Sequence, residues 1–305
     1  MNGSRRCATR ASEAMTDRCT HAASSSGTPR GTARLAPSLL RWIDSGAVTA
    51  PRHAAIGDGD GDRIDFARIL PFVGMHLACL FAFVVGVSPV AVLVAAIAYL
   101  VRMFAITGFY HRYFSHRSFK TSRAGQFVFG VLGAAAVQRG FVPDLKRVRD
   151  LLQFPELRWL DRFDILVPLL LAVGMFGLGV LLQDVAPHLG TNGWQMLIWG
   201  FFISTVACYH GTYTINSLSH VFGRQRYRTG DSSRNNWLLA LVTLGEGWHN
   251  NHHHYPSAVR QGFYWWEVDI TFYLLKLLSW LGIIWDLKPV PVAARDRSPR
   301  RIPGS

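Results

Sequence analysis

Histidine is the residue type through which this sequence could carry out chemistry. The chain contains 12 histidines, and more than half of them lie in three short clusters. The clusters read His111-Arg-Tyr-Phe-Ser-His116, Asn216-Ser-Leu-Ser-His220 and His249-Asn-Asn-His252-His253-His254. Imidazole is the commonest side-chain ligand of transition metals, and several imidazoles must converge to hold one ion. The sequence therefore predicts a metal centre built from these clusters.

The spacing of the third cluster suits a helix that presents a row of ligands. His249, His252 and His253 stand at positions i, i+3 and i+4, which share one face of an α-helix. Asn216 and His220 of the second cluster are likewise one helical turn apart. The alternative interpretation of the third cluster is a polar surface tract or an adventitious metal binder.

The first cluster has a different spacing. His116 follows His111 by five residues, which corresponds to roughly 140° around an ideal α-helix. We therefore expect these two histidines to bracket a site or to serve two ions rather than to share one helix face. The isolated histidines are interpreted as structural, and they are His21, His53, His76 and His188.

Four apolar runs approach the length of about 20 residues that crosses a bilayer. They are Ile69–Val87, Pro89–Tyr110, Ile165–Leu182 and Trp194–Ile215. Gly125–Val137 is apolar but shorter, so we expect an interfacial or buried helix there. Tyr264–Trp285 is interrupted by charged residues and rich in aromatic residues, which suits an interfacial helix. The sequence predicts an all-α membrane protein with four transmembrane helices and a cytoplasmic helical cap that carries the histidine clusters.

Composition and charge support this class of protein. Apolar residues make up 50% of the chain and the net charge is +13, which excludes a simple soluble globule once the apolar residues gather in long runs. A basic chain suits nucleic acid or an anionic membrane face, and the spans favour the membrane. Because Arg and Lys are frequent in 111–162 and absent from 183–193, the positive-inside rule places 111–162 and both termini in the cytoplasm. We expect a multi-pass protein of a bacterial inner membrane with no nucleic-acid partner.

The two ends of the chain differ from its middle. Residues 1–65 lack apolar periodicity, and we expect a disordered polar tail, with an Arg-rich transit peptide as the alternative. Residues 291–305 are predicted to be a basic C-terminal tail, which leaves 66–290 as the functional domain. The four cysteines are too scattered for a disulfide framework, and we expect Cys79 and Cys208 to be small core residues.

The ordered motifs HRYFSH, NSLSH and GEGWHNNHHHYP resemble those of the membrane fatty acyl desaturase family, close to bacterial acyl-CoA Δ9 desaturases. The likeness covers about residues 66–290. In that family eight or nine histidines hold two irons. The resemblance implies iron ligands at His111, His116, His220, His249, His252 and His253, with Asn216 reaching an iron through water. It also implies that His254 lies outside the ligand set and that His210 packs or hydrogen-bonds.

The resemblance breaks at one point. The family has a middle histidine motif of HRxHH type, but this chain has no histidine between His116 and His188. The sequence reads as an in-frame deletion at the Gly140–Phe141 junction. We expect the six remaining histidines to be able to saturate one iron but to be too few to hold two comfortably, which would impair activity.

The function implied by the resemblance is fatty acyl desaturation. Such an enzyme uses O₂ and two external electrons to insert a double bond into an acyl-CoA or acyl-lipid chain. The chain contains no motif for a flavin, a nicotinamide or a haem, so we expect a separate electron donor of ferredoxin, rubredoxin or cytochrome type with its reductase. The alternatives are a related di-iron fatty acyl hydroxylase and a non-catalytic truncated relative.

Overall fold

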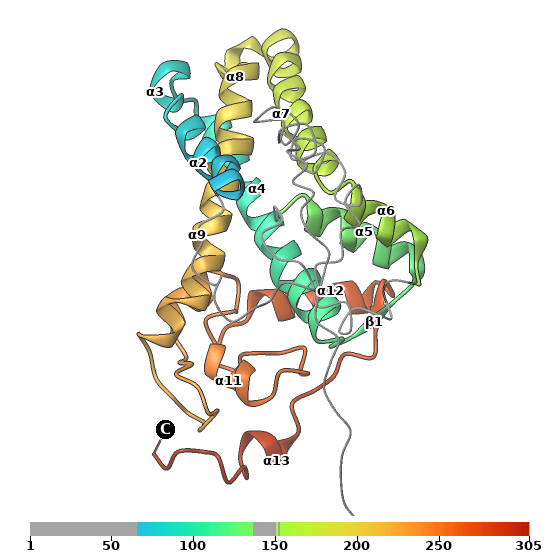
Figure 1. Ribbon diagram of the computed structural model, residues 1–305, viewed down its shortest axis with the longest axis vertical. Coiled ribbons are helices and arrows are strands. Elements are labelled where there is room, and N and C mark those ends of the chain that lie inside the picture. Colours follow the sequence, from blue (N-terminus) through green and yellow to red (C-terminus); the bar gives the residue numbers. More distant parts are fainter. Residues whose placement is uncertain (1–65, 137–150, 152, 305) are drawn as a thin grey trace, which may run out of the picture. The chain divides into compact units, whose positions relative to one another are not determined.

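The computed structural model describes residues 66–136, 151 and 153–304. The predicted N-terminal tail and the Gly140–Phe141 junction lie outside these residues. The described residues all belong to one compact unit, which covers Leu40–Ser305. They are mostly helical (Figure 1) and include one two-stranded sheet. The predicted class of a mainly helical protein is therefore confirmed.

The first predicted span is broken into two helices. Helix α2 covers Phe66–Cys79 and contains Pro71, and helix α3 covers Ala82–Val85. Helix α4, Pro89–Phe104, begins where the Ser88 hydroxyl accepts a hydrogen bond from the backbone of Ala91 and proline occupies the first turn, both common ways to start a helix. It continues without a break into η2, a π-helical segment over Ala105–Ser115. The second span therefore extends past its predicted end at Tyr110 and includes His111.

Two further long helical segments follow, and one of them packs against α4. Helix α7 covers Leu166–Val185 and is followed by the short η3, Pro187–Leu189. Helix α8, Gly193–Gln195, runs directly into η4, Met196–Ile203, and then into α9, Ser204–Asn216. The η4 and α9 segments contact α4, and η4 also contacts α7, as the placement of these segments in Figure 1 shows. Gly200 permits the close approach to α7, because a Cβ atom there would lie 3.0 Å from the Sδ atom of Met175.

Among the residues that the structure describes, two helices are long and apolar enough to cross a membrane. They are Pro89–Ser115, with 27 residues, and Leu166–Val185, with 20 residues. The other two predicted spans correspond to α2 with α3 and to α8, η4 and α9. The length and composition of these segments do not show that they cross a membrane, so the topology with four transmembrane helices stays a prediction.

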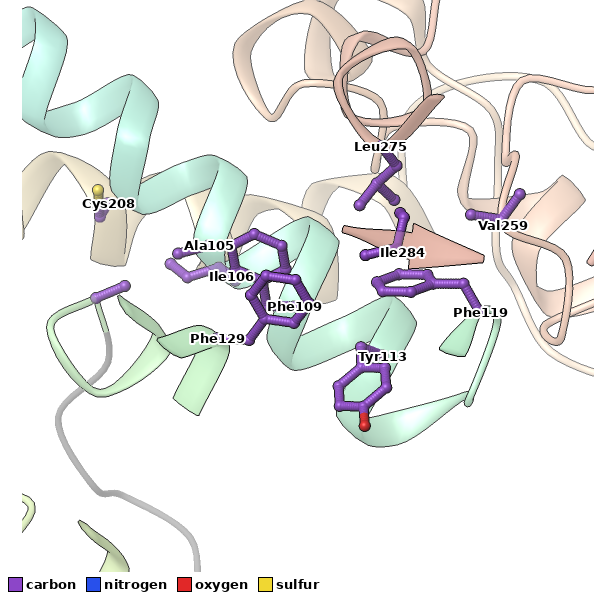
Figure 2. Close-up of a cluster of buried hydrophobic side chains, with 11 residues drawn as sticks. Ala105, Ile106, Phe109, Tyr113, Phe119, Phe129, Cys208, Val259, Leu275 and Ile284 are labelled. Atoms are coloured by element: carbon purple, nitrogen blue, oxygen red, sulfur yellow. The ribbon is translucent and has the colours of Figure 1, made fainter. Parts of the chain in front are cut away.

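A hydrophobic cluster fixes the end of the second span. Helix α5, Arg123–Ala134, lies beside η2, and Figure 2 shows the rings of Phe109 and Phe129 face to face between them. The ring centroids are 3.9 Å apart and the ring planes are nearly parallel. Helix α5 is the predicted short apolar helix, and it packs one face against η2. Helix α6, Pro155–Arg162, packs on α5 in turn.

The remaining elements form the cap. They are η5 (Leu218–His220), α10 (Trp237–Val242), α11 (His249–His254), α12 (Ile270–Trp280) and α13 (Val292–Arg295). Strands β1 (Lys120–Thr121) and β2 (Ile284–Trp285) pair antiparallel and join the end of α12 to the segment after η2. The C-terminal residues pack on the cap, since the Tyr227 hydroxyl donates to the Arg295 carbonyl at 2.8 Å.

Candidate metal centre

Six histidines form two groups of three where the end of η2 meets the cap. The first triad is His111, His116 and His252, and the second triad is His220, His249 and His253. Within each triad the ligand nitrogens all lie within 4.8 Å of one another. The six members are the six histidines that the sequence motifs predicted as ligands.

The π-helical winding of η2 brings the first triad together. The backbone N–H of His116 donates to the carbonyl of His111 at 3.2 Å, and such an i to i+5 bond places residues five apart on the same side of the helix. The Nε2 atoms of these two histidines are 3.1 Å apart, and the Nε2 atom of His252 is 3.0 Å from that of His111. The two histidines therefore lie in one group, which agrees with the first of the two expected arrangements, and π-helical rather than α-helical winding brings their rings together.

Helix α11 divides its histidines between the two triads. His252 turns toward η2, whereas His249 and His253 face His220 at the end of η5. The Nε2 atoms of His220 and His249 are 3.1 Å apart. The rings of His252 and His253 have centroids 5.7 Å apart, so the triads are neighbours. One short helix thus supplies three of the six imidazoles.

The Nδ1 atoms of three of these histidines are held by oxygen atoms. His111 Nδ1 lies 2.5 Å from the Glu246 carboxylate, and His253 Nδ1 lies 2.5 Å from the Asp231 carboxylate. His220 Nδ1 lies 3.1 Å from the Ser232 hydroxyl. Because an ionised carboxylate can only accept, Nδ1 of His111 and of His253 carries the proton, and each Nε2 presents a lone pair. This is the usual arrangement of metal-bound histidine in proteins.

Glu246 is the centre of a buried charged network. Besides His111 it accepts from Arg112 at 3.2 Å and from the Gln261 amide at 3.0 Å. Arg112 in turn donates to both carboxylate oxygens of Asp269, at 3.0 and 3.1 Å. Burial alone would raise the pKa of Glu246, but the positive charges of His111 and Arg112 and the hydrogen bonds outweigh it and hold the pKa at about 2. Glu246 is therefore ionised and can orient His111.

Three imidazoles of the site, those of His116, His249 and His252, have lowered pKa values and are neutral at physiological pH. Burial, followed by the nearby charge of His253, lowers the pKa of His249 to about 3. Burial and the charge of His111 lower the pKa of His116 to about 4. Burial also places the pKa of His252 well below its ordinary value. Because metals bind the deprotonated ring, these side chains need lose no proton to become ligands.

The two asparagines between the histidines hold α11 in place. The Asn250 side-chain oxygen accepts from the backbone N–H groups of Arg226 and Tyr227, each at 2.8 Å. The Asn251 amide donates to the Gln261 carbonyl and to Glu267, each at 2.9 Å. Both asparagines are fully buried. No role was predicted for them from the sequence, although their place within a six-residue helix of ligands was a usable signal.

Other predicted residues lie apart from the triads. Asn216 is the exposed last residue of α9, and within the described residues no hydrogen bond joins it to either triad, so its role stays a prediction. His254 stacks on Tyr227, with ring centroids 3.9 Å apart, and its Nε2 donates to the Ala294 carbonyl. This agrees with its expected place outside the ligand set.

A separate pair of histidines joins α2 to α9. His76 Nε2 lies 3.1 Å from His210 Nε2, and His76 Nδ1 donates to the Phe72 carbonyl at 2.7 Å. His76, which was interpreted as structural, contacts His210 because helices distant in sequence bring the two rings together. The expectation that His210 hydrogen-bonds is confirmed.

The donor set fits a transition metal. Each triad offers three imidazole nitrogens and no thiolate, which suits iron, zinc, copper or nickel. The buried anions Glu246 and Asp269, with Arg112, balance charge beside the first triad. The carboxylates that hold Nδ1 atoms of both triads are the partners expected of metal-bound histidines.

Comparison of the sequence with known proteins identifies the family of this chain. Residues 122–279 match the family model for fatty acid desaturase. The chain is 32% identical over 267 residues to the sn-1 stearoyl-lipid 9-desaturase of Synechocystis, covering 73% of this chain and 80% of that protein. It is 31% identical over 266 residues to delta-9 acyl-lipid desaturase 1 of Arabidopsis thaliana, covering 77% and 87%. It is 30% identical over 280 residues to an acyl-CoA 5-desaturase of Anemone leveillei, covering 76% and 82%. The chain belongs to the fatty acid desaturase family.

Proposed function

We propose that this protein is a fatty acyl desaturase with one iron position at each histidine triad. The observation that carries the proposal is the convergence of six histidines from η2, η5 and α11 into two neighbouring groups of three. The substrate would be an acyl-lipid or an acyl-CoA, since relatives of both kinds are similar to this chain over most of its length. Asn216 would reach an iron through water.

The protein's own groups would hold and orient the metal. Iron, when bound, supplies the activation of O₂ with two external electrons that desaturation of unactivated methylenes requires. Glu246 and Asp231 keep the Nδ1 proton on His111 and His253, so that Nε2 faces the ion. His249 and His252 are buried and limit the access of water. The electrons would come from a separate donor protein.

The membrane arrangement is part of the proposal. Two long apolar helices and two shorter or interrupted apolar segments support four spans with the cap on one side. The excess of basic residues in 111–162 supports a cytoplasmic cap with both termini on that side. We take residues 66–290 as the desaturase domain, 1–65 as a polar tail and 291–305 as a basic C-terminal segment.

We also propose that the missing middle motif impairs the chain. The alignment with the Synechocystis enzyme spans 267 residues but takes up 73% of this chain of 305, or about 223 residues. About 44 aligned positions therefore have no counterpart here, which supports an internal deletion. Each triad then offers three imidazoles to an ion that accepts up to about six ligands, so we expect weak iron binding and slow turnover.

The test compares the chain with a restored version. The second protein carries a relative's HRxHH-bearing segment after Gly140, and both are expressed in the same membranes with the same electron donor. We expect the restored version to bind more iron and to produce more unsaturated fatty acid. Equal rates would show that the missing motif is not needed. Hydroxy acids would indicate a hydroxylase, and no product or iron from either version would indicate a non-catalytic relative.

A further inference from the structure

An exposed apolar surface lies on the cap next to the second triad. It comes from two segments that are separate in sequence, η5 with the residues after it and α10. Its large side chains are all exposed, and they are Leu218, Val221, Phe222, Trp237, Leu238 and Leu241. We call these six residues the apolar cap surface. Soluble proteins rarely expose an apolar patch of this kind unless it marks an interaction site.

Backbone hydrogen bonds hold the two segments side by side. The N–H groups of Arg224 and Asn235 each donate to the carbonyl of the other residue, at 2.9 and 2.8 Å. Gly223 permits this approach, because its φ is 126° and a Cβ atom there would lie 2.4 Å from the Asn235 carbonyl oxygen. Phe222 and Trp237 therefore belong to one continuous surface, and they are 59% and 69% exposed.

This surface continues into the long apolar helices. Helix α10 contacts α9, and the Tyr99 hydroxyl of α4 donates to the Val242 carbonyl at the end of α10, at 2.7 Å. Tyr99 precedes His111 in the continuous α4–η2 helix, and their separation along the chain corresponds to roughly 15 Å toward the interior of the span. A tyrosine side chain is much shorter than this distance. The end of α10 therefore lies on the membrane side of the first triad.

The residues at the edge of the surface suit the boundary between lipid and water. Arg224 follows the first segment and Arg234 precedes the second, so two arginines flank the apolar side chains. Tryptophan with nearby arginine is typical of segments that lie in the membrane interface, where the cations reach the lipid head groups. A soluble protein partner would have to displace lipid to cover a surface that continues into the spans. These features favour lipid as the occupant.

We propose that the apolar cap surface inserts into the bilayer on the cap side, so that lipid acyl chains cover it and Arg224 and Arg234 lie among the head groups. The inference rests on the membrane arrangement in the proposed function, but not on iron or on desaturation. It has a consequence for the second triad, because His220 is the last residue of η5 and lies between Leu218 and Phe222. The bilayer thereby restrains the segment that supplies this histidine.

Depth measurements on the spin-labelled full-length protein test the proposal. The four cysteines are replaced by alanine, and the protein is reconstituted in vesicles of phosphatidylcholine and phosphatidylglycerol. Single labels are introduced through Phe222→Cys, Leu238→Cys and, as an exposed site in the C-terminal segment, Arg297→Cys. Collisions with O₂, which concentrates in hydrocarbon, are compared with collisions with a water-soluble nickel chelate. Relative to the label at position 297, we expect the labels at 222 and 238 to meet O₂ several-fold more often and the chelate several-fold less often.

A second variant tests the surface as a unit. Phe222→Ser combined with Trp237→Ser removes two exposed rings, so stability in micelles should stay as in the unsubstituted protein. In vesicles the label at position 238 should then become several-fold more accessible to the chelate. If Phe222→Cys does not fold, Val221→Cys, which is also exposed, replaces it.

The control for the membrane arrangement is Leu93→Cys, at an exposed residue of α4. A label there that meets O₂ while those at 222 and 238 behave like the label at 297 would overturn the proposal and leave the span intact. Labels at 222 and 238 that are shielded from both reagents would also overturn it, since a protein segment or a second copy would then cover the surface. A water-exposed label at Leu93 would refute the span itself and this surface with it.

Discussion

Replacing Glu246 by glutamine separates the orienting role of this carboxylate from its role in the fold. Its side chain is 3% exposed and lies between His111 Nδ1, at 2.5 Å, and Arg112, at 3.2 Å. Glutamine can still accept one hydrogen bond from His111, but it loses the charge and places an NH₂ group among donors. We therefore expect both weaker metal binding and lower stability.

The magnitudes follow from the network. Removing one partner of a buried ion pair costs about 3–5 kcal/mol, and Arg112 keeps two hydrogen bonds to Asp269, so we expect about 3 kcal/mol. Loss of the group that orients a ligating histidine typically lowers metal affinity about 10–100-fold. The first triad should show this loss, whereas the second triad should keep its affinity.

Asp231→Asn is the matched control. Asp231 holds His253 as Glu246 holds His111, but its side chain is 36% exposed, so this contact contributes at most about 1 kcal/mol. We expect a similar loss of metal affinity, now at the second triad, with little change in stability. Metal titration and denaturant unfolding of the metal-free proteins in micelles measure both quantities. If Glu246→Gln lowers stability while both triads bind metal as in wild type, Glu246 is only a structural group.

Three further outcomes are expected. His252→Ala should lower bound iron, whereas His188→Ala should not, and equal effects in metal analysis would indicate general destabilisation. Because the pKa of His249 is about 3 in the fold and about 6.5 when unfolded, its contribution to stability is complete above pH 6.5 and is lost as pH falls toward 3. Between pH 6.5 and 5, this residue should therefore lower the free energy of unfolding of the metal-free protein by about 2 kcal/mol. His249→Gln should make the free energy of unfolding depend less on pH. An unchanged pH dependence in this variant would contradict the reasoning. Reporter fusions should give a periplasmic signal at Asn192 and a cytoplasmic signal at Ser305, and either opposite signal would refute the four-span topology.

Much of the site could be predicted because it depends on residue type and local spacing. The histidine clusters predicted a metal centre, since few residue types bind transition metals and clustering raises the chance of convergence, and the resemblance to the desaturase family implied which six histidines are ligands. The apolar runs predicted the long helices because they too depend only on residue type and on position along the chain. Side-chain chemistry and its spacing along the chain can be interpreted without knowledge of the fold.

The pairing of the histidines could not be predicted, because it depends on helix type and on packing. An ideal α-helix separates His111 from His116, and only the π-helical bond between their backbones joins them. Likewise, one face of α11 serves two triads because η2 and η5 approach it from different sides. The network of Glu246 and Asp269 with Arg112 could not be predicted for the same reason, since these residues are distant in sequence and contact one another only in the folded protein.

The sharing of α11 has a consequence for how metal binding and folding are coupled. This helix has six residues, too few to be stable alone, and it supplies His252 to the first triad and His249 and His253 to the second. Asn250 and Asn251 hold it against the segments around Tyr227 and Gln261, which restrains the helix in part before any ion binds. An ion at one triad would restrain α11 further and reduce the ordering entropy left for the second ion to remove. The two triads should therefore fill cooperatively, and loosening of the asparagine contacts should weaken both together.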